Sequence, residues 1–268
     1  MPVRRYEGPP AVDEEATVIG QHPVAPGYQR LRLRADRIAR DVAPGQFVMV
    51  RAGERHDPLL RRPMSIAGAD PASGTIEMLY RVTGVGTSLL AGRHAGDKLP
   101  VLGPLGRPFE LPPAGTILLV GGGIGMPPLC FAATRLPPAR TLVIQGARTE
   151  ALLLCRESLA ALGVGHRYAT EDGSAGVRGL VTDLLGQVLC DIASPVEILA
   201  CGPMAMLMAV ARMARERAIR CQVSVEERMA CGFGICMGCA MRLARSTETP
   251  EYALVCVDGP VFEGTDIV

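Results

Sequence analysis

Residues 231–239 have the sequence Cys231-Gly-Phe-Gly-Ile-Cys236-Met-Gly-Cys239, and a further cysteine, Cys256, follows near the C-terminus. The spacing C-x4-C-x2-C with a later fourth cysteine is the plant-type ligand pattern of a [2Fe–2S] cluster. Four soft thiolates satisfy both irons of such a cluster. The glycines between them allow backbone angles that other residues resist, so that amides can approach the sulfurs closely. These four cysteines are therefore predicted to ligate a [2Fe–2S] cluster.

Three other uses of these cysteines compete with the cluster. A structural zinc site usually has two C-x2–4-C pairs, which the four-residue gap and the distant Cys256 fit poorly. Disulfides need an oxidising compartment, and no feature of the chain indicates secretion. Plain buried thiols do not gather among glycines. The iron–sulfur interpretation is favoured, and zinc stays as the alternative.

Length and composition set limits on the class of protein. At 268 residues the chain is long for one core and suits two compact domains with a small appendage. The 28 basic and 27 acidic residues nearly cancel, and no basic stripe with interleaved aromatics points to nucleic acid. The N-terminus lacks the apolar run of a secretory signal, and glycines and prolines interrupt the most apolar stretch, residues 116–133. A cytoplasmic protein without a membrane span is expected.

The other five cysteines are scattered among apolar neighbours. In a cytoplasmic protein most of them are interpreted as reduced core thiols. They are Cys130, Cys155, Cys190, Cys201 and Cys221.

Short runs of alternating apolar and polar residues, separated by turn residues, fill the first part of the chain. Residues 28–34 alternate with period two, as do parts of 46–51 and 75–82. About six such strands predict a small antiparallel barrel, assigned to residues 12–112.

Two segments of this barrel carry polar groups suited to a dinucleotide. Arg62-Pro63-Met64-Ser65 places a guanidinium and a hydroxyl at a strand end, where arginine can bind a diphosphate by paired hydrogen bonds. Leu79-Tyr80-Arg81 runs toward Gly86-Thr87, and a short helix expected from Ser88 would offer free amides to phosphate. Tyr80 and Arg81 could flank a flat ring. The alternative is an exposed arginine beside a turn.

Residues 113–222 follow a strand and helix pattern. The strand 116–120 leads into Gly121, Gly122 and Gly123, then Gly125, and a helix starts at Met126. The pattern departs from G-x-G-x-x-G because Met126 occupies the place of the third glycine, and no acidic residue closes the next strand, 141–145. An ordinary Rossmann dehydrogenase is therefore disfavoured. Arg148 could accept a 2′-phosphate or simply face solvent.

A five-stranded parallel sheet with helices on both faces is expected in this half. The further strands are predicted at 165–169, 196–200 and 221–225. The fourth strand ends in Cys201-Gly202-Pro203, at the sheet edge where ligands of open α/β folds bind. The methionines and leucines of the helix predicted over 204–217 are assigned to the core.

The barrel motifs resemble the flavin signature of the ferredoxin reductase superfamily, in which the barrel binds FAD. The resemblance covers Arg62 to Ser65, Tyr80-Arg81 and Gly86-Thr87. In the following half, Gly121 to Gly125 is similar to the superfamily's pyridine-nucleotide diphosphate turn, and Cys201-Gly-Pro203 to its motif near the nicotinamide. The resemblance implies FAD and, on family grounds, NAD(H).

The cysteine module, residues 223–268, narrows the resemblance. The segments 224–239, 255–262 and 171–183 closely resemble the electron transfer subunits of dihydroorotate dehydrogenase B. That family implies a partner, an FMN-containing catalytic subunit, in a heterotetramer with two of each chain. Electrons from dihydroorotate would pass through the cluster and FAD to NAD+ in pyrimidine (UMP) biosynthesis.

This chemistry needs little acid–base catalysis, so no catalytic side chain is nominated. The histidines are interpreted as surface residues: His22, His56, His94 and His166. A subunit interface is expected around the cluster, with Phe233, Ile235 and Met237 helping to seal it. The polar stretch within 239–256, which includes residues 245–250, is expected to be a loop of variable length.

Two other functions are compatible with the sequence. Reductase subunits that pass electrons between NAD(P)H and ferredoxin or sulfur compounds share the same three-part plan. A non-catalytic interaction module whose four cysteines hold zinc belongs to a different class. Colour separates the zinc module from an electron carrier, because flavin and iron–sulfur proteins absorb visible light and a zinc module does not.

Overall fold

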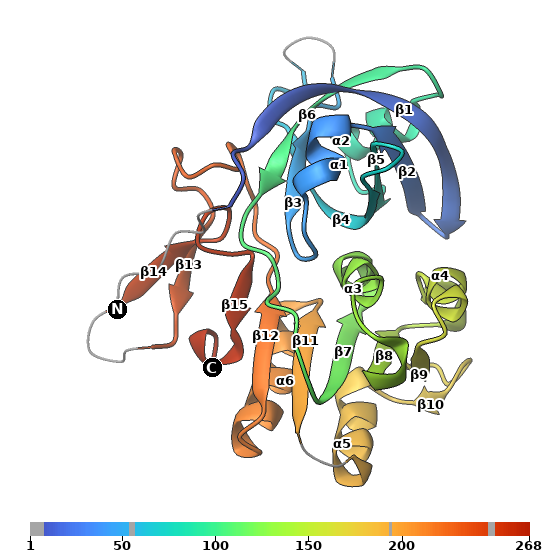
Figure 1. Ribbon diagram of the computed structural model, residues 1–268, viewed down its shortest axis with the longest axis vertical. Coiled ribbons are helices and arrows are strands. Elements are labelled where there is room, and N and C mark those ends of the chain that lie inside the picture. Colours follow the sequence, from blue (N-terminus) through green and yellow to red (C-terminus); the bar gives the residue numbers. More distant parts are fainter. Residues whose placement is uncertain (1–7, 54–56, 193–194, 246–249) are drawn as a thin grey trace.

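The computed structural model of the protein describes residues 8–53, 57–192, 195–245 and 250–268, and it has three parts (Figure 1). A closed β-barrel lies above a parallel sheet flanked by helices, and a small C-terminal module lies beside both. This is the predicted architecture. The predicted boundaries at residues 112 and 222 stay predictions, because the C-terminal module also contributes a strand to the sheet.

The barrel is antiparallel with strand order β1-β2-β5-β4-β3-β6, which confirms the six predicted strands. Alternation explains its interior: Leu31 and Leu33 on one strand and Ile76, Met78 and Tyr80 on another are buried in a single apolar core. Its elements are β1 (Val12–Ala25), β2 (Tyr28–Arg34), α1 (Asp36–Asp41), β3 (Phe47–Val50), β4 (Arg62–Asp70), β5 (Thr75–Arg81), α2 (Val85–Ala91) and β6 (Lys98–Leu105).

Helix α2 begins at Val85, three residues before the predicted start. Gly84 precedes it, and the Thr87 hydroxyl accepts hydrogen bonds from the amides of Thr83 (2.9 Å) and Gly84 (3.1 Å). The threonine thus satisfies two amides at the start of the helix.

The five strands predicted for the nucleotide half are all present and parallel, in the order β9-β8-β7-β11-β12. The sheet has seven strands in the described residues, because a short β10 adds to β9 in parallel and β15 adds to β12 antiparallel. These strands are β7 (Thr116–Gly122), β8 (Thr141–Ala147), β9 (Gly165–Thr170), β10 (Val177–Arg178), β11 (Val196–Cys201), β12 (Arg220–Ser224) and β15 (Val261–Glu263).

Alternate residues of the central strands serve two apolar cores, one on each face of the sheet. Leu118 and Val120 of β7 face the core that contains α5 and α6, whereas Ile117 and Leu119 face the core that contains α3 and α4. The helices are α3 (Met126–Ala133), α4 (Arg156–Ala161), α5 (Val181–Asp191) and α6 (Met204–Glu216), with short 3-10 turns η1 (Gly123–Gly125), η2 (Pro138–Arg140) and η3 (Glu150–Leu152).

Helix α3 lies between the barrel and the sheet (Figure 1). All eight of its residues are buried, since one side packs on β7 and another on β4. Phe131 reaches the barrel core, and Leu129 packs in the same cluster as Leu79 of β5. The predicted helix start at Met126 is confirmed. This helix therefore fixes the barrel over the carboxyl ends of the strands.

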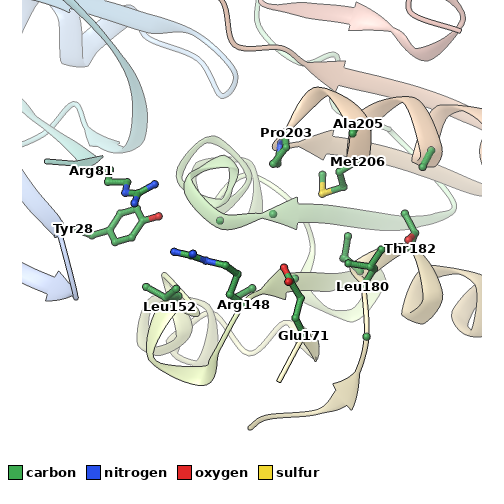
Figure 2. A pocket seen from close by; sticks show the side chains of 17 residues that line it. Tyr28, Arg81, Arg148, Leu152, Glu171, Leu180, Thr182, Pro203, Ala205 and Met206 are labelled. Carbon is green, nitrogen blue, oxygen red and sulfur yellow. The ribbon is translucent and has the colours of Figure 1, made fainter. Parts of the chain in front are cut away.

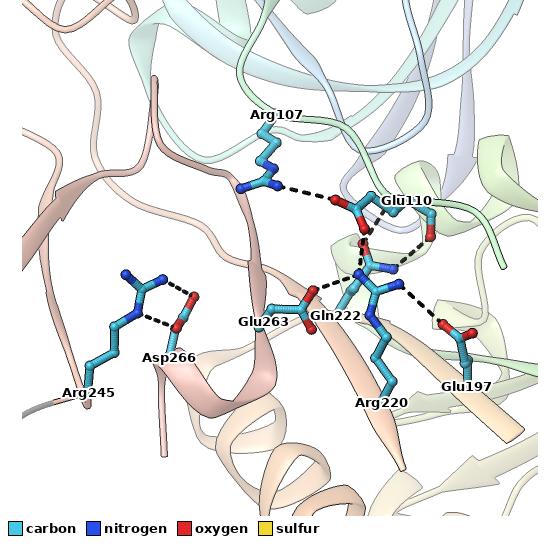
Figure 3. Close-up of polar contacts among 8 residues, drawn as sticks. All are labelled: Arg107, Glu110, Glu197, Arg220, Gln222, Arg245, Glu263 and Asp266. Atoms are coloured by element: carbon cyan, nitrogen blue, oxygen red, sulfur yellow. Dashed lines mark hydrogen bonds and ion pairs between the residues drawn. The ribbon is translucent and has the colours of Figure 1, made fainter. Parts of the chain in front are cut away.

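The C-terminal module consists of the hairpin β13 (Ala240–Leu243) and β14 (Glu251–Leu254), strand β15 and the turn η4 (Gly264–Asp266). Polar contacts anchor it (Figure 3): Arg220 of β12 donates to Glu263 (2.8 Å) and Glu110 (2.5 Å), and Arg245 pairs with Asp266 (2.6 and 2.9 Å). The hairpin, the sheet and the segment leaving the barrel are thus tied together. Among the described helices, none combines the length and apolarity needed to cross a membrane.

Candidate functional site

The cysteine loop lies on the module's surface where it meets the barrel. Gly232 and Gly234 have φ angles of 83° and 87°, and Met237 has 60°. A Cβ on Gly232 would lie 2.5 Å from Met49 Cγ, and one on Gly234 would lie 2.7 Å from Val257 Cγ2. The two glycines are therefore required both for the turns and for close packing.

The amide groups of this loop point at sulfur. The amide of Cys236 donates to Cys231 Sγ at 3.5 Å, and the amide of Gly238 donates to Cys236 Sγ at 3.4 Å. Burial raises the pKa of Cys231, but the amides of Cys236 and Phe233 outweigh it, and the pKa falls to about 6. Hydrogen bonds of this kind stabilise a thiolate, which is the form that binds iron.

The four thiols form two neighbouring pairs. Cys231 and Cys236 are close enough for one thiol to lower the pKa of the other. Burial and the neighbouring Cys239 thiol raise the pKa of Cys256 to about 12. No three His, Cys, Asp or Glu side chains of the described residues are grouped around a position for one metal ion. Two pairs fit a two-iron cluster, which takes two ligands on each iron, better than a single zinc ion.

A first cavity, of about 350 Å³, lies between the barrel and the carboxyl end of β12. Segment 224–227 and Met229 form its far wall, which sequence reasoning missed because no motif marks it. Burial raises the pKa of Glu226 in that wall. The cavity is lined by most of the predicted FAD residues: Arg62, Pro63, Met64, Ser65, Leu79, Tyr80, Arg81 and Thr87.

Gly86 contributes to this cavity through Arg62. A Cβ on Gly86 would lie 2.3 Å from Arg62 Nε, so the glycine leaves room for the guanidinium, which also donates to the Leu60 carbonyl at 2.6 Å. Tyr80 is 3% exposed and its hydroxyl donates to Gln21 Oε1 at 3.0 Å, so that burial raises its pKa. The Tyr80 hydroxyl is therefore hydrogen-bonded within the barrel, whereas the neighbouring Arg81 is exposed.

A second cavity, of about 540 Å³, lies at the carboxyl ends of β7, β8 and β9 (Figure 2). Gly122, Gly123 and Pro203 line it. Gly121, Gly125, Cys201 and Gly202 do not line it and instead shape the wall: a Cβ on Gly125 would lie 2.2 Å from the Cys201 carbonyl oxygen. The two predicted nucleotide motifs are thus in direct contact. Met206 also lines this cavity, although its helix was assigned to the core.

Sequence reasoning also missed Glu171. It follows β9 and lines the second cavity with Arg148, which follows β8 (Figure 2). A dinucleotide site is expected to have its acidic residue after the second strand, 141–145, whereas Glu171 follows the third strand, β9. The signal was present in the sequence as Glu171-Asp172 directly after a predicted strand.

The surface assignment of His166 was wrong, whereas the prediction that most of the scattered cysteines lie in the core is confirmed. His166 is half-buried: its Nε2 pairs with Gln145 Oε1 at 3.0 Å and its Nδ1 with the Tyr168 hydroxyl at 3.1 Å. Cys190 is exposed on α5, whereas the other four scattered cysteines are buried. His22 and His94 are exposed as predicted, and His56 and residues 246–249 lie outside the described residues.

A barrel with one cavity, a parallel sheet with a second cavity and an iron–sulfur-type loop define a reductase of the ferredoxin reductase type. Residues 226–268 match the family model "Iron-sulfur cluster binding domain of dihydroorotate dehydrogenase B". The structure of an NADH-dependent reduced ferredoxin–NADP oxidoreductase superposes with a TM-score of 0.83 at 27% identity, covering 94% of this chain and 89% of that one. An Amycolatopsis cytochrome P450 reductase gives 0.65 at 27% identity, covering 78% and 67%.

Relatives with assigned names are more similar still. The electron transfer subunit of dihydroorotate dehydrogenase B (NAD(+)) from Shouchella clausii is 40% identical over 94% of this chain and 96% of the relative. The subunit from Geobacillus thermodenitrificans is 40% identical over 95% and 98%. The chain therefore belongs to the family of dihydroorotate dehydrogenase B electron transfer subunits. The predicted family, fold and oxidoreductase class are confirmed.

Proposed function

We propose that this chain relays electrons from an FMN-containing dihydroorotate dehydrogenase catalytic subunit, through a [2Fe–2S] cluster and FAD, to NAD+ in pyrimidine biosynthesis. The observation that carries the proposal is the sequence of sites along the molecule. A loop with two thiol pairs, a cavity lined by the FAD motif and a cavity lined by the glycine turn follow one another. A cluster carries single electrons, nicotinamide takes a hydride, and a flavin converts between them.

The chain's own residues hold and separate these groups. Arg62 and Thr87 supply a guanidinium and a hydroxyl to the FAD cavity, and Ser65 supplies a second hydroxyl. Cys231, Cys236, Cys239 and Cys256 hold the cluster, with the amides of Cys236 and Gly238 directed at sulfur.

NAD(H) rather than NADP(H) is the proposed nucleotide. Glu171 lies in the nucleotide cavity, and a carboxylate accepts hydrogen bonds from ribose hydroxyls but repels a 2′-phosphate. Because NAD(H) has no 2′-phosphate, Arg148 would not bind one.

The partner is proposed to dock on the cluster loop. Phe233, Ile235 and Met237 are 48%, 75% and 60% exposed, and they lie within three residues of the exposed Cys236 in the sequence. Apolar side chains at such a position would exclude water from the route between the two subunits. A heterotetramer with two of each chain, in the cytoplasm, is the proposed assembly.

The test measures cluster content, FAD content and electron transfer to NAD+ separately. Anaerobically purified protein is expected to contain about two iron and two acid-labile sulfide atoms and about one FAD per chain. Cys236→Ser is expected to lose iron but to keep FAD and its reduction by NADH, while dihydroorotate-dependent NAD+ reduction with the FMN subunit falls at least about 100-fold.

Cys190→Ser is the matched control, because Cys190 is exposed on α5. It should retain iron, FAD and relay activity. Wild-type protein that holds zinc and no flavin would contradict the proposal, and transfer to ferredoxin but never to the FMN subunit would favour the other reductase class.

A further inference from the structure

Two cysteines outside the cluster loop are neighbours in space. Cys130 lies in the middle of α3, and Cys155 directly precedes α4, the helix beside it (Figure 1). They are 5% and 9% exposed and belong to the same apolar cluster. The Cys155 thiol donates a hydrogen bond to the Cys130 sulfur, which lowers the pKa of Cys130, whereas the same bond and then burial raise the pKa of Cys155. The two sulfurs thus form a pair in which one thiol stabilises the thiolate of the other.

A third cavity, of about 640 Å³, gives small molecules access to this pair. It lies between the end of the barrel formed by β1 and β2 and the region of α4, and Cys155 lines it with Arg30 and Arg156. Arg30 is ion-paired with Glu77 at 3.3 Å, and these two charges act on the thiols in opposite directions. The hydrogen bond between the sulfurs is therefore the larger influence on both thiols.

The backbone of Cys155 has an unusual conformation. Its φ angle is 62°, in the left-handed region that residues other than glycine rarely adopt. Two hydrogen bonds hold the segment there: the Leu159 amide donates to the Cys155 carbonyl at 2.9 Å, and the Gln145 side chain donates to the Leu154 carbonyl at 3.1 Å. Backbone strain of this kind is concentrated at functional positions. Strain, a neighbouring thiol and a cavity thus coincide at Cys155.

We infer that Cys130 and Cys155 form a redox-active dithiol, which hydrogen peroxide that enters the third cavity converts reversibly into a disulfide. The thiolate of the pair attacks one peroxide oxygen, the O–O bond breaks, and the leaving hydroxide takes up a proton and departs as water. The second thiol then attacks the sulfenic acid sulfur, so that the S–S bond forms and another water leaves. Two thiols and one peroxide give one disulfide and two waters. A small thiol reverses the reaction by exchange.

The disulfide would connect the helix that carries the barrel to the start of α4. Helix α3 packs on β4 of the barrel and on β7 of the sheet, so a bond from Cys130 to Cys155 ties this junction to the next helix. A disulfide also restricts the unfolded chain by closing the loop between its two cysteines. The oxidised protein is therefore expected to melt about 5 °C higher than the reduced protein.

The test is peptide mapping of the protein loaded with FAD and cluster. The reduced protein is treated anaerobically with hydrogen peroxide, its free thiols are blocked with iodoacetamide, and it is digested without reduction for mass spectrometry. A peptide pair that joins Cys130 to Cys155 is expected, and dithiothreitol should abolish it. The melting temperature is measured before and after peroxide. Cys155→Ser and Cys130→Ala, given the same treatment, should lack both the peptide pair and the rise in melting temperature.

Cys221→Ser is the matched control. Cys221 is 5% exposed, as Cys130 is, but burial and then Glu263 raise its pKa to about 12, and no described thiol acts on it. This variant should form the Cys130–Cys155 bond as the wild type does. Absence of that bond in the oxidised wild type overturns the inference, as do cross-links to Cys221 of equal yield or a bond that leaves the melting temperature unchanged. The wild-type measurements decide the matter even where a variant does not fold.

Discussion

His166 is held neutral by its surroundings. Burial, and then the Arg156 guanidinium, lower its pKa from 6.5 to about 4. The His166 imidazole therefore binds a proton at a higher pH in the unfolded chain than in the folded chain. The free energy of unfolding is expected to fall as pH drops from about 6.5 to about 4, by about 2 kcal/mol after allowance for partial solvent screening.

Urea unfolding of the wild type and His166→Gln at about pH 7 and pH 4.5 measures this contribution. The variant should lose less stability than the wild type over that interval. His94→Gln, at an exposed histidine, should behave like the wild type. An equal loss in wild type and His166→Gln would refute the expectation.

Single residues show where sequence reasoning works and where it fails. Spacing alone predicts the four cluster cysteines, because ligand chemistry imposes fixed intervals along the chain, and the structure brings them together as two neighbouring pairs. His166 was misjudged because its burial depends on Gln145, Tyr168 and Arg156, which pack against it only after β8, β9 and α4 assemble. Cys190 is the exception to the prediction that most of the scattered cysteines are core thiols, because a helical position among apolar residues can still face outward.

Helix α2 places Gly86 directly against the guanidinium of Arg62, which lines the FAD cavity. A methyl group on Gly86 would lie 2.3 Å from Arg62 Nε, although an alanine suits the helix itself. Gly86→Ala is therefore expected to displace the guanidinium and weaken FAD binding by about 10-fold, with little change in the free energy of unfolding. Flavin fluorescence during FAD titration of the deflavinated protein measures the affinity.

Gly92→Ala is the control at the other end of this helix, where the nearest atom to the added methyl lies 3.6 Å away. It should leave FAD affinity unchanged. Equal affinity in both variants would mean that Arg62 does not hold FAD.

At the level of elements, periodicity predicted the barrel and the five parallel strands, because each face of a strand must match a core. It failed at α2, where Val85 and Gly86 are poor helix formers and the Thr87 hydroxyl holds the helix start. It also missed β15, since three residues carry no detectable period and pair only because β12 presents an open edge.

For the whole molecule, the order of motifs predicted three parts but not how they join. Gln222 of β12 is buried, and its side chain donates to the Glu110 carbonyl at 2.7 Å and accepts from the Glu110 amide at 2.9 Å. Arg220 adds contacts to Glu110 and Glu263 (Figure 3). These contacts join residues 43 to 112 positions apart, so local patterns do not reveal them.

Assembly with the catalytic subunit should depend on the apolar side chains around the cluster. Ile235 is 75% exposed next to Cys236, and a charge there would have to be buried against the partner. Ile235→Asp is expected to weaken binding of the FMN subunit by about 10- to 100-fold, because truncating or charging a central contact costs that much. Iron content and NADH reduction of FAD within the isolated chain should stay the same.

Leu89→Asp provides the control, since it adds the same charge at an exposed apolar residue of the barrel, 42% exposed on α2. Calorimetric titration of each purified variant with the FMN subunit gives the affinity, and the iron content shows that the loop is intact. If Ile235→Asp binds the partner as tightly as Leu89→Asp does, the partner docks elsewhere. The cluster loop would then have to exchange electrons from outside the subunit interface, across water, which would make its three exposed apolar side chains unexplained.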